Sequence, residues 1–387
     1  MRIILVGNYP PDNLESMGRF AQMLHSGFLK MGIKSEIWFP ICVFGHFVKQ
    51  TNYGFGKWIG YFDKFLIFPF ILLFRLIYLN FGASNVHFHI CDQGNAPYLM
   101  FLPVNRTVVT CHDVLAIRSA LGYSGTYIPV SHLGRYYQKW IFHYLTRAKY
   151  LASVSHKTLT QLLELNFANR TFVGNWKVIP NGLNANFRVL AEKEQNYFLT
   201  RVGIDPEIPF LLHVGSDNLR KNRKLLVDMI ADLGDKWLGL VCFAGDKIEP
   251  NLLCYAESLG LKSRVMSIVK PDHTTLVSLY NGCDAFIFPS FSEGFGWPVI
   301  EAQACGSPVI VSDIEPLREV GGEGAIYCDP SNPSEFARAF LFLKDELSRS
   351  TLIQRGFENS LRFDSKQMTY EYLKLHKFNQ TSGSKTY

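Results

Sequence analysis

The chain has 387 residues, of which 48% are hydrophobic and 19% are charged. This length favours two domains, and the apolar content excludes an intrinsically disordered protein. The formal charge of +6 is uneven, because residues 1–190 carry 18 Lys and Arg against 7 Asp and Glu, and residues 191–387 carry 21 against 26. A basic first half therefore precedes an acidic second half. No recognised nucleic-acid-binding module accompanies the positive charge, so we expect no nucleic-acid partner.

The first half opens with an apolar strand and a helix, predicted over residues 3–7 and 18–31, with Gly32 as the C-cap. The apolar run before Asn8 and Pro10 is too short for a signal peptide. Further strands of this half are predicted at 36–39, 86–90, 107–111, 150–154 and 176–179.

Residues 53–81 hold eleven aromatic side chains in twenty-nine positions. A spanning helix needs about 20 apolar residues, and Asp63, Pro69 and Arg75 interrupt this stretch. Two interpretations stay open. One is a core helix or helical hairpin, which is favoured because internal helices are commoner. The other is an element that lies on a membrane, with basic side chains at the phosphate head groups. A helix pair buried on one side only would satisfy both.

The second half alternates strands and helices at regular spacing. Strands are predicted at 210–215, 238–245, 264–269, 285–289, 308–312 and 325–329, and helices at 224–233, 252–259, 274–281, 298–304 and 334–347. This pattern implies right-handed βαβ units and a doubly wound parallel sheet. We therefore predict an α/β protein with two Rossmann-like domains, 1–185 and 200–362, and a boundary within the polar stretch 181–205.

Eight cysteines are scattered through the chain without a C-x-x-C pair, so neither a zinc knuckle nor a thioredoxin-like centre is indicated. Most have apolar neighbours, as Cys242 does, which is typical of buried thiols in a reducing compartment. We therefore expect a cytoplasmic protein.

The segment 290–311 carries the densest signal for chemistry. A predicted strand ends just before it, and Pro298 fits the first turn of a helix. Gly294 and Gly296 would let the backbone approach a ligand closely. The loop amides and the helix N-terminus would then form a cradle for phosphate oxygens, beyond the carboxyl end of a strand.

Glu293 and Glu301 stand eight residues apart, where paired carboxylates can hold the hydroxyl groups of a sugar and a ribose. Alone, Glu301 could simply stabilise a helix dipole, worth about 0.3–1 kcal/mol; the glycines and the second acid favour binding. The two acids match the E-x7-E signature of glycosyltransferase family 4, and the chain resembles this family. Its members have the GT-B fold of two facing Rossmann-like domains with parallel sheets.

Other segments carry the same resemblance, which is strong in 205–330 and weak in 40–105. They are Val109-Thr-Cys-His-Asp113, Val178-Ile-Pro-Asn-Gly-Leu183, His213-Val-Gly-Ser-Asp-Asn-Leu-Arg-Lys-Asn222 and Phe363-Asp-Ser-Lys366. The last resembles the start of the family's terminal helix, here 363–380, which crosses back to the first domain.

The resemblance implies roles for individual residues. It assigns catalytic roles to Glu293, His112, Lys221 and Arg220, and donor binding to Gly18, Ser216, Gly294, Phe295, Gly296 and Glu301. Glu301 would bind the ribose and Glu293 the donor sugar, with the loop amides on the sugar or the diphosphate. Arg220 and Lys221 would neutralise the diphosphate, because cations at a helix start oppose its dipole unless an anion is present. Many relatives have Arg where this chain has Ser216, so whether Arg220 alone supplies the guanidinium stays open.

In the first half, His112 matches the histidine near the sugar's primary hydroxyl, with Asp113 as a candidate orienting partner. Gly18 matches a glycine that lets the backbone approach the diphosphate. Met17 stands where the family usually has a further glycine, so acceptor contacts in this loop stay open.

The resemblance implies a retaining transfer from a nucleotide-diphosphate sugar, in cell-surface polysaccharide synthesis. No D-x-D occurs, so no metal or other cofactor is expected, and cationic side chains and amides would stabilise the departing diphosphate. Similarity over 290–311 mildly favours mannose from GDP-mannose. The acceptor would be a glycan or a lipid-linked saccharide that suits the basic first half, with 53–81 as a peripheral contact on the cytoplasmic face of the membrane.

Other functions are weighed against this one. A GT-B sugar phosphorylase or a nucleotide-sugar epimerase would share the site, and would show dependence on inorganic phosphate or activity on the donor alone. A non-catalytic nucleotide-sugar sensor is disfavoured by the retained Glu293, Lys221 and His112. A nicotinamide oxidoreductase is excluded, because Gly7 and Gly18 are too far apart for G-x-G-x-x-G.

Overall fold

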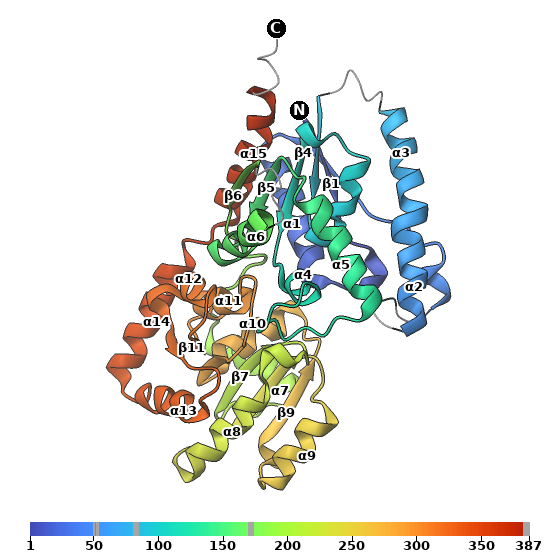
Figure 1. Cartoon of the computed structure of the whole chain (residues 1–387). Coiled ribbons are helices and arrows are strands. Elements are labelled where there is room, and N and C mark those ends of the chain that lie inside the picture. The colour runs from blue at the N-terminus through green and yellow to red at the C-terminus, as the bar shows by residue number, and fades with distance from the viewer. Residues whose placement is uncertain (49–50, 52–53, 80–84, 169–173, 382–387) are drawn as a thin grey trace. The chain divides into compact units, whose positions relative to one another are not determined.

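The structure, a computed structural model, describes residues 1–48, 51, 54–79, 85–168 and 174–381. The chain divides into two compact α/β units (Figure 1). Unit 1 comprises Met1–Gly122, Val130–Asn184 and Ser365–Tyr387, and unit 2 comprises Tyr123–Pro129 and Ala185–Asp364.

Unit 1 is built on six parallel strands in the order β2-β1-β3-β4-β5-β6. Their bounds are β1 Arg2–Val6, β2 Lys34–Trp38, β3 Val86–Ile90, β4 Thr107–Cys111, β5 Tyr150–Ser153 and β6 Asn175–Val178. In the register of the sheet, Ile4 lies beside Glu36 and Phe88. The inner strands β1, β3, β4 and β5 are buried almost throughout, because helices cover both faces of a parallel sheet.

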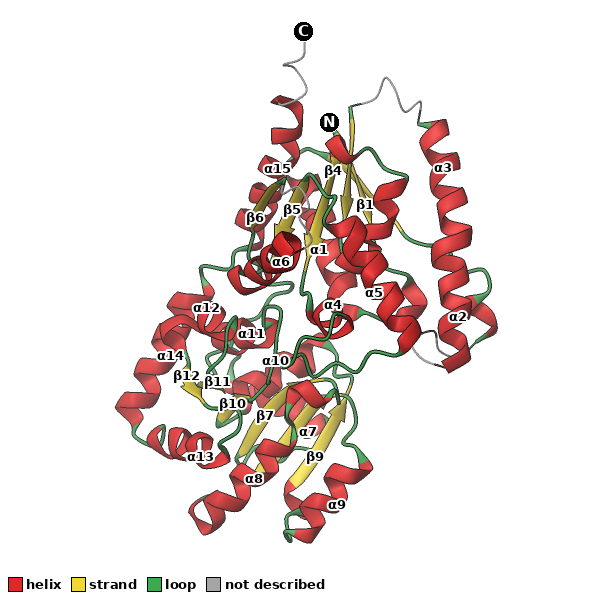
Figure 2. Cartoon of the chain, viewed as in Figure 1, coloured by secondary structure: helices red, strands yellow, loops and turns green. Residues whose placement is uncertain are grey.

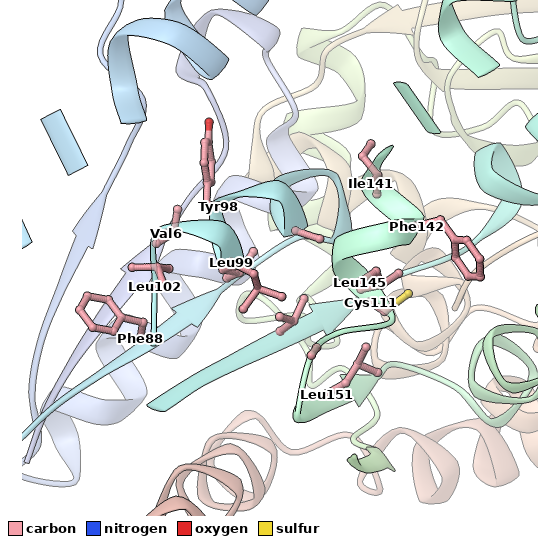
Figure 3. Close-up of a cluster of buried hydrophobic side chains, with 14 of the residues drawn as sticks. Val6, Phe88, Tyr98, Leu99, Leu102, Cys111, Ile141, Phe142, Leu145 and Leu151 are labelled. Atoms are coloured by element: carbon pink, nitrogen blue, oxygen red, sulfur yellow. The ribbon is translucent and has the colours of Figure 1, made fainter. Parts of the chain in front are cut away.

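The helices of unit 1 are α1 Glu15–Lys30, α2 Gly54–Phe62, α3 Phe68–Tyr78, α4 Leu115–Ala120, α5 His132–Leu145, α6 His156–Ala168 and α15 Ser365–Thr381. Figure 3 shows part of the unit 1 core, where Phe88 and Leu151 come from the strands and Leu145 comes from α5. Leu99 of the 3₁₀ segment Gln93–Met100 and Leu102, which follows that segment, belong to the same core. Each of these five side chains is buried.

The last helix, α15, belongs to unit 1 although it follows unit 2 in the chain. Thr110 in β4 donates a hydrogen bond from Oγ1 to the Tyr372 hydroxyl at 3.2 Å. His89 in β3 and His376 are hydrogen-bonded through Nδ1 and Nε2 at 3.2 Å. The predicted terminal helix that returns to the first Rossmann-like fold is therefore confirmed.

Unit 2 repeats the plan with six parallel strands in the order β12-β11-β10-β7-β8-β9 (Figure 2). Its strands are β7 Phe210–Gly215, β8 Leu240–Gly245, β9 Val265–Val269, β10 Ala285–Phe288, β11 Val309–Ser312 and β12 Ile326–Cys328. Its helices are α7 Glu192–Arg201, α8 Lys224–Leu233, α9 Pro250–Ser258, α10 His273–Gly282, α11 Trp297–Ala304, α12 Leu317–Gly321, α13 Pro333–Phe342 and α14 Glu346–Ser360. The α/β class with two parallel sheets is thus confirmed.

The prediction of a single helix over 334–347 is wrong at its C-terminal end. The structure has two helices there, α13 and α14, separated at Leu343–Asp345. The Asp345 side chain accepts a hydrogen bond from the Ser348 amide at 2.8 Å, so it starts a new helix as an N-cap.

The aromatic segment forms a helical rod, α2 and α3 joined by a π turn at Asp63–Ile67. Phe68, Leu72 and Leu76 are buried in the unit 1 core, which confirms the core-helix interpretation for one side of the rod. Residues 53 and 80–81 of the predicted segment lie outside the described residues. Within the described ranges, none of the helices has the length and apolarity needed to cross a bilayer.

Candidate functional site

The predicted site residues of unit 2 gather where β7 and β10 end. These strands are parallel neighbours, so their carboxyl ends meet at one edge of the sheet, where ligands bind in such folds. A 3₁₀ turn, Leu219–Lys221, follows β7, and the loop 289–296 follows β10. The Phe291 amide donates to the Arg220 carbonyl at 2.8 Å, and this bond fixes the turn against the loop.

At this edge two cations converge on one carboxylate oxygen. Glu293 Oε1 lies 2.7 Å from Arg220 Nη1 and 2.7 Å from Lys221 Nζ. Glu293 and Lys221 are buried, and Lys221 Nζ also lies 4.5 Å from the centre of the Phe288 ring. Arg220 Nη1 donates a second hydrogen bond to the Ser292 carbonyl at 3.0 Å. The structure thus brings three of the four predicted catalytic residues into one cluster.

The cluster sets the charge of its members. Burial lowers the pKa of Lys221 to about 8; Glu293 opposes this shift and the Arg220 charge adds to it. For Glu293, burial would raise the pKa, but the charges and hydrogen bonds of Lys221 and Arg220 lower it to about 2. Glu293 is therefore fully ionised at neutral pH, whereas Lys221 gives up its proton unusually easily for a lysine.

Glu301 lies inside α11, where it accepts a hydrogen bond from the Tyr280 hydroxyl to Oε2 at 2.9 Å. Both side chains are buried, and burial and the Glu301 charge raise the pKa of Tyr280 well above its usual range. The phenol therefore stays a donor and fixes the orientation of the carboxylate. Sequence reasoning missed Tyr280, because a tyrosine in an apolar helix looks like any core residue.

The start of α11 has the backbone geometry that the glycines predicted. Gly296 is the N-cap with φ of 109°, a conformation that side chains disfavour, and a Cβ there would lie 2.7 Å from Leu317 Cδ2. Gly294 is half-buried in the loop before it. Phe295 is buried, with its ring 5.8 Å from that of Phe363. Its side chain is thus part of the core of unit 2, and its predicted role in donor binding depends on its backbone amide.

The end of β7 brings His213 and Lys221 to one small space beside Gly215. A Cβ on Gly215 would lie 3.4 Å from Lys221 Cε and 3.6 Å from His213 Nε2. His213 donates a hydrogen bond to the Ile287 carbonyl from Nδ1 at 3.2 Å, and among the described residues its buried Nε2 has no hydrogen-bond partner. Ser216 is half-buried directly after this strand.

Two predicted site residues, His112 and Gly18, belong to unit 1. His112 follows β4, and its Nε2 lies 2.9 Å from the Cys91 carbonyl, to which the ring therefore donates. Burial lowers the pKa of His112 against the opposing charge of Asp92, so the ring is neutral at neutral pH. Asp113 Oδ1 accepts from the Leu115 amide at 3.0 Å and so caps α4.

Gly18 lies in the first turns of α1, and no atom of another described element lies within 4 Å of where its Cβ would be. The backbone of α1 therefore has room for a ligand at this point, and the role of Gly18 in donor binding stays a prediction. The part of the chain that the structure describes contains no group of three His, Cys, Asp or Glu side chains that could hold a metal ion.

The fold is that of known glycosyltransferases. The chain matches sucrose-phosphate synthase from Thermosynechococcus elongatus with a TM-score of 0.73 and 16% identity, covering 99% of this chain and 100% of that one. It matches WaaG, a glycosyltransferase involved in lipopolysaccharide biosynthesis, with a TM-score of 0.68 and 14% identity over 96% and 98% of the two chains. The two α/β units thus have the GT-B fold.

Residues 198–359 match the family model of glycosyl transferases group 1. The chain is 28% identical over 236 residues to the O-antigen chain mannosyltransferase RfbU of Salmonella typhimurium, covering 61% of this chain and 60% of the relative. It is 27% identical over 240 residues to an N,N'-diacetylbacillosaminyl-diphospho-undecaprenol alpha-1,3-N-acetylgalactosaminyltransferase of Campylobacter jejuni, covering 58% and 62%. The matched region thus spans about 60% of these relatives' length.

Proposed function

We propose that this protein is a retaining hexosyltransferase of the family 4 type. It moves a sugar from a nucleotide-diphosphate donor to a glycan or lipid-linked saccharide, in cell-surface polysaccharide synthesis. The observation that carries this proposal is the convergence of Arg220 and Lys221 on Glu293 at the carboxyl edge of the unit 2 sheet. Mannose is the favoured sugar, and its support is the similarity to O-antigen chain mannosyltransferases.

The two cations act on the leaving group. When the sugar's anomeric bond breaks, negative charge develops on the nucleotide diphosphate. Arg220 and Lys221 stabilise that charge from a water-poor position, where each contact is stronger than in bulk water. The diphosphate replaces Glu293 as their main anionic partner. We propose that this exchange turns the Glu293 carboxylate toward the sugar, and that cationic side chains and amides make a metal unnecessary.

The remaining residues position the donor. Glu301, oriented by Tyr280, accepts hydrogen bonds from the ribose hydroxyls. The amides of the loop and the first turn of α11, around Phe295 and Gly296, bind the sugar or phosphate oxygens. In unit 1, His112 has a neutral ring that donates through Nε2, so Nδ1 is the acceptor nitrogen for a sugar hydroxyl.

We also place the reaction in the cytoplasm. All eight cysteines lie within the described part of the chain and all are thiols, in support of a reducing compartment.

A thermal-shift panel of nucleotide sugars tests the donor. We expect one of them, with GDP-mannose first in order, to raise the melting temperature, and Glu301→Ala to abolish this rise. Glu207→Ala, an exposed carboxylate elsewhere in unit 2, is the matched control and should keep it. A panel without any response would overturn the proposal.

The responsive donor is then incubated with and without saccharide acceptors. NMR of the product's anomeric proton should show the configuration of the donor, and activity should survive EDTA. Donor consumption that requires inorganic phosphate would identify a phosphorylase. Conversion of the donor without any acceptor would identify an epimerase, and binding without turnover would identify a sensor.

A further inference from the structure

Helices α2 and α3 follow one another as a rod in unit 1 (Figure 1), and large apolar side chains are exposed along its whole length. Its exposed large side chains are Trp58, Phe62, Leu66, Phe70, Leu73, Phe74, Ile77 and Tyr78. The exposed fractions of Phe70, Phe74 and Ile77 are 67%, 71% and 77%. A stripe of this size and spacing is unusual for a solvated helix and marks an interaction surface.

The π turn keeps this stripe straight. In an α-helix, side chains four residues apart drift by about 40° at each step. A π turn holds more residues per turn and so offsets part of that drift. Because the π turn falls at Asp63–Ile67, between Phe62 and Phe70, it brings the exposed side chains of α2 and α3 to one side of the rod.

The polar side chains of the rod's middle are turned inward. Asp63 is fully buried, where it accepts hydrogen bonds from the Tyr9 hydroxyl at 2.6 Å and from the amides of Val43, Phe44 and Gly45. Lys64 forms an ion pair with Asp12 at 2.7 Å. Asp63 is the one acidic residue between 54 and 78, so the outward side carries no negative charge.

The surface extends onto the loop that receives Asp63. The rings of Phe44 and Phe62 are in edge contact, with 5.2 Å between their centres. Ile41, Val43 and Phe47 of the same loop are exposed as well. The rod and this loop therefore form one apolar face, which we call the rod face.

The helix that packs beside the rod is positively charged. Helix α5 packs on the rod through ring contacts, with Phe65 5.6 Å from Tyr137 and 5.0 Å from Trp140. On the same helix Arg135 and Lys139 are exposed, and residues 132–145 contain no acid. Over residues 37–163 there are eleven Lys and Arg, and the three acids, Asp63, Asp92 and Asp113, are buried or half-buried.

We propose that the rod face docks on an anionic lipid bilayer. The apolar stripe would enter the boundary between head groups and acyl chains, and Arg135 and Lys139 would contact phosphate groups. Aromatic residues near both ends of the rod, Trp58 and Tyr78, suit an interface that is apolar on one side and wet on the other. A second copy of the chain fits less well, since the excess of basic residues over 37–163 would make two such surfaces repel each other. This inference stands apart from the identity of the donor.

The test is flotation of the full-length protein with vesicles. Phosphatidylcholine vesicles containing phosphatidylglycerol are compared with vesicles of phosphatidylcholine alone. We expect binding to the anionic vesicles, weakened by salt. Phe70→Ser/Phe74→Ser/Ile77→Ser should reduce binding at least about tenfold, since three large apolar groups leave the interface. Arg135→Ser/Lys139→Ser should reduce it roughly fivefold per charge.

The matched control replaces three exposed leucines of unit 2, Leu238, Leu347 and Leu361, by Ser; they are 69%, 75% and 79% exposed. This control should bind vesicles as the parent does. Equal binding of the rod-face variant and the parent would overturn the proposal, as would absence of binding to anionic vesicles. A concentration-dependent dimer that the triple variant abolishes, without vesicle binding, would assign the face to self-association instead.

The donor-induced thermal shift is measured on every variant. It shows that each variant is folded, and it separates the two proposals, because the rod face lies in unit 1 and the proposed donor contacts of Glu301 and Arg220 lie in unit 2. If the triple variant does not fold, Arg135→Ser/Lys139→Ser and the comparison of the two lipid compositions decide the question.

Discussion

Replacement of Glu293 by glutamine tests the cation cluster most directly. The pKa of Glu293 is about 2 instead of 4.5, a difference that corresponds to roughly 3 kcal/mol in favour of the charged carboxylate in the folded protein. The side chain is buried, so solvent screens little of this energy. Glu293→Gln should therefore lower the free energy of unfolding.

Lys221 limits that loss. Its pKa of about 8 means that at pH 7 it loses its proton for about 1.4 kcal/mol. In the variant it can become neutral instead of remaining an unpaired buried cation. We therefore expect a destabilisation of about 1–3 kcal/mol at pH 7, measured by denaturant unfolding. Glu371→Gln, whose ion pairs with Lys177 and Lys374 are partly exposed, should cost less than about 1 kcal/mol.

The difference in stability between the parent and Glu293→Gln should depend on pH in a defined direction. A carboxylate with a lowered pKa stabilises the folded state above pH 4.5, and this contribution is lost as the pH falls toward 2. The stability gap between the parent and Glu293→Gln should therefore narrow below pH 4.5. A gap that stays constant or widens there would refute the reasoning.

Glu293→Gln should also be stabilised by a nucleoside diphosphate. A nucleoside diphosphate would replace the missing anion, so GDP or UDP should raise the melting temperature of Glu293→Gln more than that of the parent. Sugar transfer should be lost. A weaker thermal response in the variant would show that the cations do not receive the diphosphate.

Three further predictions concern the same unit. Affinity for GDP or UDP, measured by calorimetry, should fall as the pH rises above 8, because Lys221 loses its proton there. Lys221→Arg should flatten this pH profile. A parent affinity that stays constant to pH 9 would contradict the role of Lys221 in binding the diphosphate. Tyr280→Phe leaves the buried Glu301 carboxylate without its phenol donor, so it should cost about 1–3 kcal/mol of stability and weaken donor binding, and an unchanged melting temperature and donor response would count against it. Gly296→Ala places a Cβ against Leu317 at a strained φ and should cost about 1 kcal/mol or more in denaturant unfolding, whereas a neutral result would mean that the turn relaxes freely.

The two sheets and the loop of Glu293 could be predicted from sequence, because each depends on local pattern. Apolar runs such as Phe286 to Phe288 are typical of buried parallel strands, and glycines beside Pro298 indicate a strand-to-helix turn. The pairing of Glu293 with Lys221 could not be derived in this way. The two residues are 72 positions apart, and only the parallel pairing of β7 with β10 brings them together.

Other features of the structure could not be predicted from the sequence for related reasons. The bond of Tyr280 to Glu301 joins two helices whose faces depend on packing. The π turn in the rod has no sequence signal, and it begins at Asp63, whose side chain is buried against the loop amides. Segment Tyr123–Pro129 belongs to unit 2, and the rings of Tyr127 and Phe291 are stacked with 4.7 Å between their centres. No periodicity in that short polar stretch could have indicated a contact so distant in sequence.

The return of α15 to unit 1 has a consequence for how the protein is made. During synthesis, β1 to β6 leave the ribosome long before residues 365–381 exist, with nearly all of unit 2 translated in between. Until then, His89 and Thr110 lack the partners that His376 and Tyr372 provide, and Gly27 lacks Thr369, which lies close against it. Unit 1 therefore cannot complete its fold while its first six strands are being synthesised, and it does so only after α15 has been translated. A nascent chain that stops before residue 365 would keep an open side on unit 1, while unit 2 would already have its whole sheet.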